Sequence, residues 1–575
     1  MTKIILFLTA FPLFVFAQKP DYKTIFENGN GNQGANYDQT IAFYEMLAKD
    51  FPTLKIEECG LTDSGKPLHL LLFSSDKDFS YPSAKKSIIL VNNGIHAGEP
   101  DGIDATMQLI RDLATGKIKA PKNVIFATIP VYNIGGFLNR NSTSRVNQDG
   151  PEEYGFRGNA RNFDLNRDFI KSDARNTKSL TDIFRKLDAD IFIDNHVSNG
   201  ADYQYVLTYI MTQHNRLGNA LGDYMNKELT PALVSDLKKK KIESTPYVNA
   251  WGETPDAHGF AQFYDGPRYA TGYTSLFNAI GFVVETHMLK KYDKRVKATY
   301  EFMISAIDFA DSHASEIKSK RLENEKQFTA GNKYAIAWQI DSSKVEKIEF
   351  LGYEGSYKKS DVTTGERLFY DRKKPFKKQI PFYKEYKPAK EITIPEAYVI
   401  PQGWWNVIGL LQQNGIRGGR IKKDTVIEIE SYRIADYKTG TNAYEGHYQH
   451  RNTKVTSAKI KMQFHKGDFI FPTNQKGAKY LLETLEPEAG DSFFNWNFFD
   501  STLQQKEGYS DYVFEDLAAE ILRKNPSLKA ELDEKRKSDE AFAKNPEAQL
   551  DWVYKHSKYY EKAHLQYPVY RIVKP

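Results

Sequence analysis

The hydrophobic and polar positions of the first 320 residues follow two alternating patterns. Short runs of Ile, Val, Leu and Phe, typical of buried strands, are separated by longer stretches in which apolar residues recur every three or four positions, as in amphipathic helices. The predicted strands are 54–56, 68–73, 88–91, 124–129, 190–194, 204–210 and 281–284, and the predicted helices are 38–50, 102–113, 174–187, 215–229 and 293–320. Asp101 is a candidate N-cap of the second helix. The alternation predicts an α/β fold, with a mostly parallel (mixed) sheet and helices on both faces.

The pattern changes after about residue 320, where several segments alternate between apolar and polar residues with period two. These segments are 335–338, 347–351, 425–430 and 458–464. They predict a β-rich accessory region, and the charged stretch 527–564 predicts helices at its end. The aromatic run 493–499 is interpreted first as packing against the catalytic domain or as a lid, and second as a substrate surface. We therefore expect three parts: a signal peptide at 1–17, a catalytic domain at 18–325 and the accessory region at 326–575.

The first 17 residues have the pattern of a secretory signal peptide. Lys3 precedes the apolar run 4–16, and the small residues Val15 and Ala17 mark a cleavage site. That run is shorter than the roughly 20 residues of a membrane-spanning helix. We therefore expect export to the periplasm or the medium, with no membrane span. The one cysteine, Cys59, has no disulfide partner in the chain.

The overall charge argues against nucleic acid as a partner. The chain of 575 residues has 79 basic and 74 acidic residues and a formal net charge of +5. This excess is small for the length, whereas a nucleic-acid-binding domain usually carries a strongly basic face.

A His and a Glu three residues apart follow the predicted strand 88–91. His96 and Glu99 come just after this strand, at the edge where open α/β sheets bind their ligands. Both side chains are good ligands for a divalent metal. The same spacing occurs in His313 and Glu316, but these lie in a polar helical stretch with no strand before them, so we interpret them as surface residues.

A third candidate ligand, His196, follows the predicted strand 190–194. Two His and one Glu at neighbouring strand ends leave a fourth coordination position for water, which is the arrangement of a catalytic zinc site. The sequence therefore predicts one Zn²⁺ per chain, bound by His96, Glu99 and His196.

Between these ligands lies the run 157–169, which is too basic and too rich in amides for a core. It contains Asp164-Leu165-Asn166-Arg167. The ordered set of His-x-x-Glu after a strand, this tetrad and a later strand-terminal His resembles the zinc carboxypeptidase family, the carboxypeptidase A/B-like metallopeptidases. The resemblance covers about residues 35–320.

The resemblance implies a role for each matching residue. Asn166 and Arg167 match the residues that bind the terminal carboxylate of the substrate, and Asp164 matches a carboxylate that holds the first His. The upstream Arg that faces the scissile carbonyl matches Arg157 or Arg161, of which we favour Arg157.

Two further elements of the family lie near the end of the matched region. Glu285, after the apolar run 281–284, matches the general base that accepts a proton from the attacking water and returns it to the leaving amine. The family's substrate-capping Tyr has three candidates, of which Tyr264 is nearest in spacing, ahead of Tyr269 and Tyr273. Arg268 is a further candidate for contact with a carboxylate.

The resemblance implies a zinc-dependent exopeptidase that hydrolyses the C-terminal peptide bond of peptides. Two alternatives remain at this level. An aspartoacylase-like deacylase would share the metal ligands and an Asn-Arg pair, and a pseudoenzyme would bind peptide or glycan without cleaving it. Retention of Glu285 with all three ligands disfavours the second.

Overall fold

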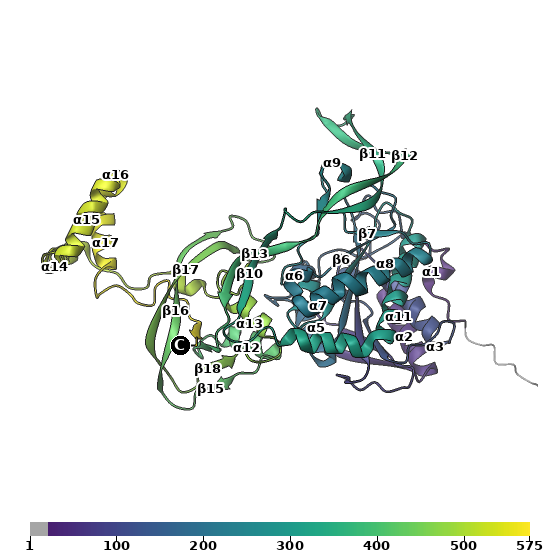
Figure 1. Cartoon of the computed structure of the whole chain (residues 1–575), viewed down its shortest axis with the longest axis horizontal. Helices are drawn as coiled ribbons and strands as arrows, with labels where there is room; N and C mark the ends of the chain where they lie inside the picture. The colour runs from purple at the N-terminus through teal and green to yellow at the C-terminus, as the bar shows by residue number, and fades with distance from the viewer. Residues whose placement is uncertain (1–20, 575) are drawn as a thin grey trace, which may run out of the picture.

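The computed structural model describes residues 21–574. The predicted signal peptide and its cleavage site lie outside the described residues. Figure 1 shows an α/β body, a β-rich part built from later residues, and a separate group of helices near the C-terminus.

An eight-stranded mixed sheet forms the centre of the α/β body. Its strands, in spatial order, are β1 (Leu54–Leu61), β2 (Pro67–Phe73), β4 (Val124–Ile129), β3 (Ser87–Asn93), β5 (Ile191–Ser198), β9 (Ile280–His287), β6 (Leu207–Met211) and β7 (Ser244–Pro246). The four central strands β4, β3, β5 and β9 run parallel, and the antiparallel pairings lie toward the edges. The predicted fold class is confirmed. The central strands are buried along nearly their whole length, because helices cover both of their faces.

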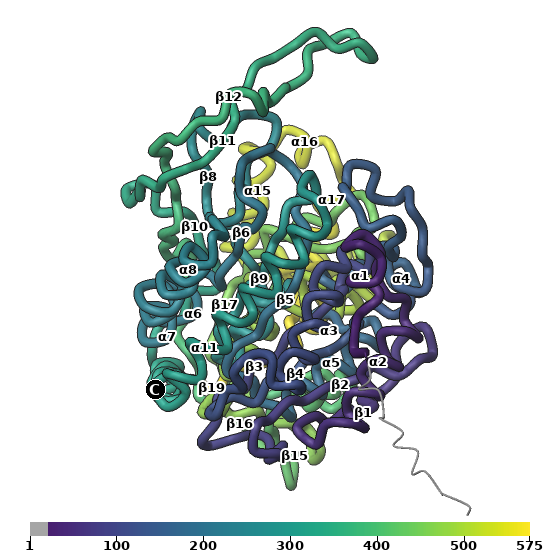
Figure 2. Tube along the Cα trace, turned by 90° about the vertical axis from the view of Figure 1, so that its right-hand side faces the viewer, coloured from purple at the N-terminus to yellow at the C-terminus, as the bar shows by residue number. Residues whose placement is uncertain are grey.

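Helices lie on both faces of this sheet (Figure 2). The longer ones are α2 (Tyr37–Asp50), α3 (Asp101–Ala114), α5 (Arg175–Leu187), α8 (Thr230–Lys239) and α11 (Tyr292–Glu325). Alternate side chains of a strand point to opposite faces. On β5, the Phe192 ring packs against Phe184 of α5, whereas Asn195 contacts Met303 of α11. His196 therefore projects to the same face as Phe192.

Two local predictions in this body are wrong. Asp101 is the first residue of α3 and does not cap it; its buried carboxylate instead accepts a hydrogen bond from Arg295 Nε at 3.0 Å. The helix predicted at 215–229 is divided into α6 (His214–Leu217), α7 (Asn219–Tyr224) and the π-helical turn η2 (Met225–Leu229). Gly218 between the first two has φ of 118°, which an α-helix cannot contain.

The β-rich part consists of three smaller sheets. They are formed by β10 (Lys333–Ile340) with β13 (Tyr386–Thr393); by β11 (Glu346–Lys359) and β12 (Glu366–Tyr383) with β8 (Phe260–Ala261); and by β15 (Gly419–Arg420), β18 (Phe469–Pro472), β14 (Ala397–Ile400), β19 (Tyr570–Ile572), β16 (Thr425–Thr439) and β17 (His450–Phe464). The β11–β12 hairpin projects from the body in Figure 1. Several strands are much longer than their predicted apolar segments, because their exposed ends carry no apolar alternation.

The remaining short helices connect these elements. They are α1 (Ile25–Asn28), α4 (Ile134–Leu138), η1 (Leu165–Arg167), α9 (Pro255–His258), α10 (Ala270–Ser275), α12 (Trp405–Gln413), α13 (Ala478–Leu485) and η3 (Asp500–Leu503). The aromatic run 493–499 is largely buried, with Phe493, Phe494 and Trp496 at 0% exposure. It packs the interior, as the first interpretation of this run predicted.

Four helices follow near the C-terminus: α14 (Asp511–Lys524), α15 (Pro526–Ser538), α16 (Glu540–Ala543) and α17 (Pro546–Lys555). They enclose a small apolar cluster of their own that includes Phe514, Leu532 and Tyr554. Among residues 21–574, no helix is both long enough and apolar enough to cross a membrane.

Candidate metal centre and active site

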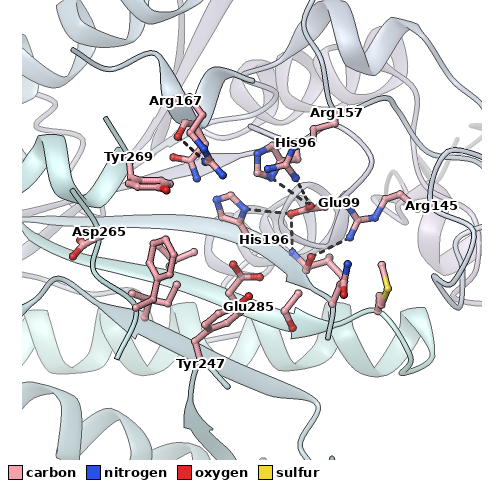
Figure 3. Close-up of a pocket in the computed structure, with 18 of the residues that line it drawn as sticks. His96, Glu99, Arg145, Arg157, Arg167, His196, Tyr247, Asp265, Tyr269 and Glu285 are labelled. Carbon is pink, nitrogen blue, oxygen red and sulfur yellow. Dashed lines mark hydrogen bonds and ion pairs between the residues drawn. The ribbon is translucent and has the colours of Figure 1, made fainter. Parts of the chain in front are cut away.

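His96, Glu99 and His196 lie together at one edge of the central sheet. His96 is in the turn after β3, Glu99 lies two residues before the start of α3, and His196 is on β5, which pairs directly with β3. One ligand atom from each residue lies within 4.8 Å of the others. All three side chains are almost fully buried, and Figure 3 shows them facing one another.

The second ring nitrogen of each His is held by a carboxylate. His96 Nε2 is 3.0 Å from Asp164 Oδ1, and His196 Nε2 is 2.8 Å from Asp194 Oδ2. The opposite nitrogens face Glu99, with His96 Nδ1 at 3.3 Å and His196 Nδ1 at 3.2 Å from its oxygens. Carboxylate partners of this kind orient metal-binding His residues.

A buried nitrogen without a hydrogen-bond partner is consistent with a metal ion at this position. His96 Nδ1 is buried and has no hydrogen-bond partner within residues 21–574. Burial alone would raise the pKa of Glu99, but Arg145 and the two His residues hold it well below its usual range. Glu99 is therefore ionised, and two imidazoles with one carboxylate form a donor set suited to zinc.

Glu285 lies beside this cluster because β9 pairs with β5. In that parallel pairing His196 is the register partner of Glu285. The carboxylate lines the same cavity as the three ligands, as Figure 3 shows. Burial, together with the nearby Glu99 carboxylate, raises the pKa of Glu285 to about 8, although His196 acts in the opposite direction. A carboxyl group with a raised pKa at a cavity wall is suited to accept and return a proton.

The cavity has a volume of about 500 Å³ and extends from this cluster between loops and the edge of the sheet. Asn166 and Arg167 both line it. The Asn166 side-chain oxygen accepts a hydrogen bond from the Ala270 backbone nitrogen at 3.0 Å. Arg167 lies 4.5 Å from the Tyr269 ring centre and donates to the Asn166 carbonyl at 2.9 Å. These contacts hold the Asn-Arg pair at the cavity wall.

Of the two candidate upstream arginines, the structure brings Arg157 to the cavity. Its Nε and Nη2 donate to Asp164 Oδ2 at 3.0 and 2.8 Å, and its Nη1 is 3.9 Å from Glu99. Arg161 lies outside the lining, packs over the Phe163 ring and donates to the Asp173 carbonyl.

Tyr264 and Arg268 are not among the residues that line the cavity. Phe263 lines it, and Tyr264, its neighbour in an extended segment, points the other way and packs against Tyr386. Arg268 is paired with Asp491 at 2.7 Å and packs over Trp496. The substrate contacts predicted for these two residues are therefore not supported by their positions.

Two residues that line the cavity were not predicted from the sequence, Tyr247 and Arg145. Tyr247, at the end of β7, lines the cavity near Glu285 (Figure 3), and Tyr269, a lesser candidate, also lines it. Arg145 donates to Glu99 Oε1 at 2.7 Å and to the Val197 carbonyl at 3.0 Å. Its side chain passes Gly98, where an added Cβ would lie 2.8 Å from Arg145 Cδ. No motif in the sequence marks Arg145 or Tyr247.

The loop between β16 and β17 also contacts the segment 164–173. Glu445, in the loop between β16 and β17, accepts a hydrogen bond at 2.9 Å from the Asp164 backbone nitrogen. In the same loop, His447 Nε2 is 2.8 Å from Asp173 Oδ2. The loop between β16 and β17 therefore supports the segment that carries Asn166 and Arg167.

Replacing Glu445 with Ala is expected to raise KM for peptide substrates about fivefold, because the Asp164 amide loses an acceptor worth about 1 kcal/mol and its loop shifts. Glu445→Gln keeps an acceptor oxygen and should restore most of the loss. KM, kcat and thermal stability of both variants check this. Equal KM values for Glu445→Ala and the parent would contradict it.

Residues 40–199 match the family model described as zinc carboxypeptidase. This part of the chain belongs to the zinc carboxypeptidase family. The matched range contains the two His residues, Glu99 and the Asp164–Arg167 tetrad, and the recognition made from the sequence is confirmed.

Similarity to curated proteins extends beyond the matched range. Carboxypeptidase 2 of Trichophyton rubrum is 21% identical over 484 residues, which cover 81% of this chain and 84% of the relative. Probable carboxypeptidase 2 of Trichophyton verrucosum is 21% identical over 483 residues, covering 80% and 86%. A solved metallo-carboxypeptidase structure from Burkholderia cenocepacia aligns with 48% of this chain and 70% of its own, at 15% identity and a TM-score of 0.36.

Proposed function

We propose that this protein is a zinc-dependent exopeptidase that hydrolyses the C-terminal peptide bond of peptides. One observation carries the proposal: a His-Glu-His cluster, a carboxylate of raised pKa and an Asn-Arg pair line a single cavity. The first two are the parts of a metal-assisted hydrolysis site, and the third suits recognition of a free α-carboxylate.

The residues of the cavity divide the chemistry among them. His96, Glu99 and His196 would hold the zinc ion, which supplies, when bound, a Lewis acid that polarises the scissile carbonyl and activates water. Glu285 accepts the proton of the attacking water and donates it to the leaving amine. Arg157, which lies beside the ligand cluster, stabilises the negative charge that develops on the carbonyl oxygen.

Asn166 and Arg167 anchor the terminal carboxylate of the peptide. A guanidinium donates two parallel hydrogen bonds to a carboxylate, which fixes the direction in which the chain enters. Because the pair shares the cavity with Glu285, the bond presented for cleavage is the last one of the chain.

Loss of one metal ligand is expected to remove the metal and the activity together. His196→Ala leaves two ligands, and zinc content measured by atomic spectroscopy should fall to a small fraction of one per chain. As a matched control, the pair His313 and Glu316 has the same spacing, but His313 is stacked on Phe309 of α11 at 4.2 Å. His313→Ala should keep full zinc and activity. Full zinc in His196→Ala would refute the ligand set.

We further propose that the chain is exported, with cleavage near Ala17, and that residues 18–325 form the catalytic domain and 326–575 the accessory region. The signal-peptide pattern supports the first statement. The end of α11 at Glu325 and the β-rich sheets that follow support the second. No contact in the site favours the deacylase or the pseudoenzyme alternative.

A further inference from the structure

A second cavity lies behind one wall of the active-site cavity. It has a volume of about 200 Å³. Ile210, Tyr247 and Phe263 line both cavities, so these three side chains form a wall that the two share. The three metal ligands and Glu285 line only the active-site cavity. The second cavity is therefore separate from the catalytic groups but in contact with residues that surround the substrate.

The far walls of the second cavity come from two parts of the chain and are apolar. Pro231 and Val234 belong to α8, whereas Ile348 is on β11 and Phe382 on β12 of the projecting hairpin. Apolar cavities of about 150 Å³ bind benzene in other proteins. A cavity of this size, lined by rings and aliphatic side chains, suits a single aromatic ring or a small fused pair, which pack against wall rings edge-to-face or offset.

The polar groups of the second cavity restrict the ligand further. Gln262 lines it and is 5% exposed; its Nε2 donates to the Met211 carbonyl at 2.8 Å, and its Oε1 has no hydrogen-bond partner within residues 21–574. A donor on the ligand would supply that partner. The charged lining residues, Glu346 and Lys384, are 2.5 Å apart and neutralise each other. These groups favour a neutral ligand with one N–H or O–H donor.

A continuous series of ring contacts joins the shared wall to the Asn-Arg pair. The ring centres of Tyr247 and Phe263 are 6.3 Å apart at 78°, and those of Phe263 and Tyr269 are 5.3 Å apart at 83°. Arg167 lies 4.5 Å from the centre of the Tyr269 ring. Figure 3 shows Tyr247 and Tyr269 on the same side of the cavity as Arg167 and Glu285. Because packed rings move together, the position of the shared wall affects the position of Arg167.

From these contacts we propose that the second cavity binds a small neutral aromatic molecule with one hydrogen-bond donor, such as a phenol or an indole, and that this molecule strengthens peptide binding in the active site. The ligand packs against the rings of Tyr247 and Phe263 from behind and restricts their motion. Arg167 then loses less freedom when it binds the terminal carboxylate. The effect on peptide binding rests on the proposed function, whereas binding of the aromatic molecule does not.

The test uses the zinc-loaded full chain with indole, phenol and toluene. Calorimetry should show one site for indole and phenol, with toluene, which has no donor, bound about fivefold more weakly. Saturating indole should lower KM for a free-acid peptide about fivefold and leave kcat nearly unchanged. Indole has no carboxylate and does not compete for the Asn-Arg pair. Absence of indole binding, or binding that leaves KM unchanged, would overturn the proposal.

Variants then assign the effect to this cavity. Val234→Trp fills it from α8 and should abolish both indole binding and the effect of indole on KM. Ile348→Ala removes part of the far wall and should weaken indole binding about fivefold, which decides the question if Val234→Trp does not fold. Ser235 is the next residue of α8 and is exposed, so Ser235→Trp should bind indole as the parent does.

Indole binding that is unchanged in Val234→Trp and Ile348→Ala would place the site elsewhere and overturn the proposal. A parent enzyme that releases no C-terminal residue would instead refute the proposed function. In that case the calorimetric titrations of the parent and the variants still test the second cavity, so the two failures are distinguishable.

Discussion

Glu285→Gln should retain zinc and fold yet lose nearly all turnover. The amide fills the same volume on β9 but cannot accept a proton from the attacking water. Loss of a general base typically lowers the rate by about 10² to 10⁴. Measuring kcat beside the zinc content separates the two properties, because Glu285 is not one of the three residues of the metal cluster.

A near-normal kcat in Glu285→Gln would move the base elsewhere. His287, two residues further along β9, is a poor substitute, since its Nε2 is 2.9 Å from the Ala201 carbonyl and it does not line the cavity. Burial and nearby Lys290 lower the pKa of His287 to about 4, so it is neutral near pH 7. His287→Gln should therefore lower kcat far less than Glu285→Gln does.

The central sheet could be predicted because each of its central strands contains a continuous apolar run. Runs such as 88–91 and 124–129 are covered on both faces, and parallel strands covered on both faces have an uninterrupted hydrophobic signal. The position of His96 and His196 then follows from topology, since neighbouring parallel strands end at the same edge. The candidate metal cluster could therefore be predicted from the sequence.

Residues that reach the cavity from loops could not be found in this way. Arg145 contacts Glu99 across 46 positions and Glu445 contacts Asp164 across 281, with no periodic pattern around either residue. Tyr264 was chosen by spacing alone, but spacing does not fix which side of an extended segment a ring occupies. Phe263 and Tyr264 are neighbours that face opposite directions.

The partner of Arg268 could not be predicted from the local sequence either. A basic residue in a polar loop can meet a substrate carboxylate or a carboxylate of the chain itself, and the local sequence is the same in both cases. Here Asp491, 223 positions later, accepts the bond from Arg268 Nε at 2.7 Å. The partner lies in the accessory region, so the choice depends on tertiary packing between distant segments.

Peptides amidated at the C-terminus should be poor substrates of the parent enzyme. Asn166 and Arg167 would lose the charged partner that their fork geometry matches. Removing one partner of a shielded charge pair costs on the order of 2 to 5 kcal/mol. Because the Arg167 side chain is 21% exposed, we expect the lower end, about 30-fold in kcat/KM at roughly 1.36 kcal/mol per decade.

The same loss should appear when the enzyme is changed instead of the substrate. Arg167→Ala should cleave the free-acid peptide about 30-fold less well than the parent does and should barely distinguish acid from amide, since the group that reads the charge is gone. Arg167→Lys keeps the charge without the fork and should fall between the two. Equal cleavage of acid and amide peptides by the parent would rule out an exopeptidase while leaving a zinc hydrolase intact, because the metal cluster and Glu285 do not depend on the terminal carboxylate.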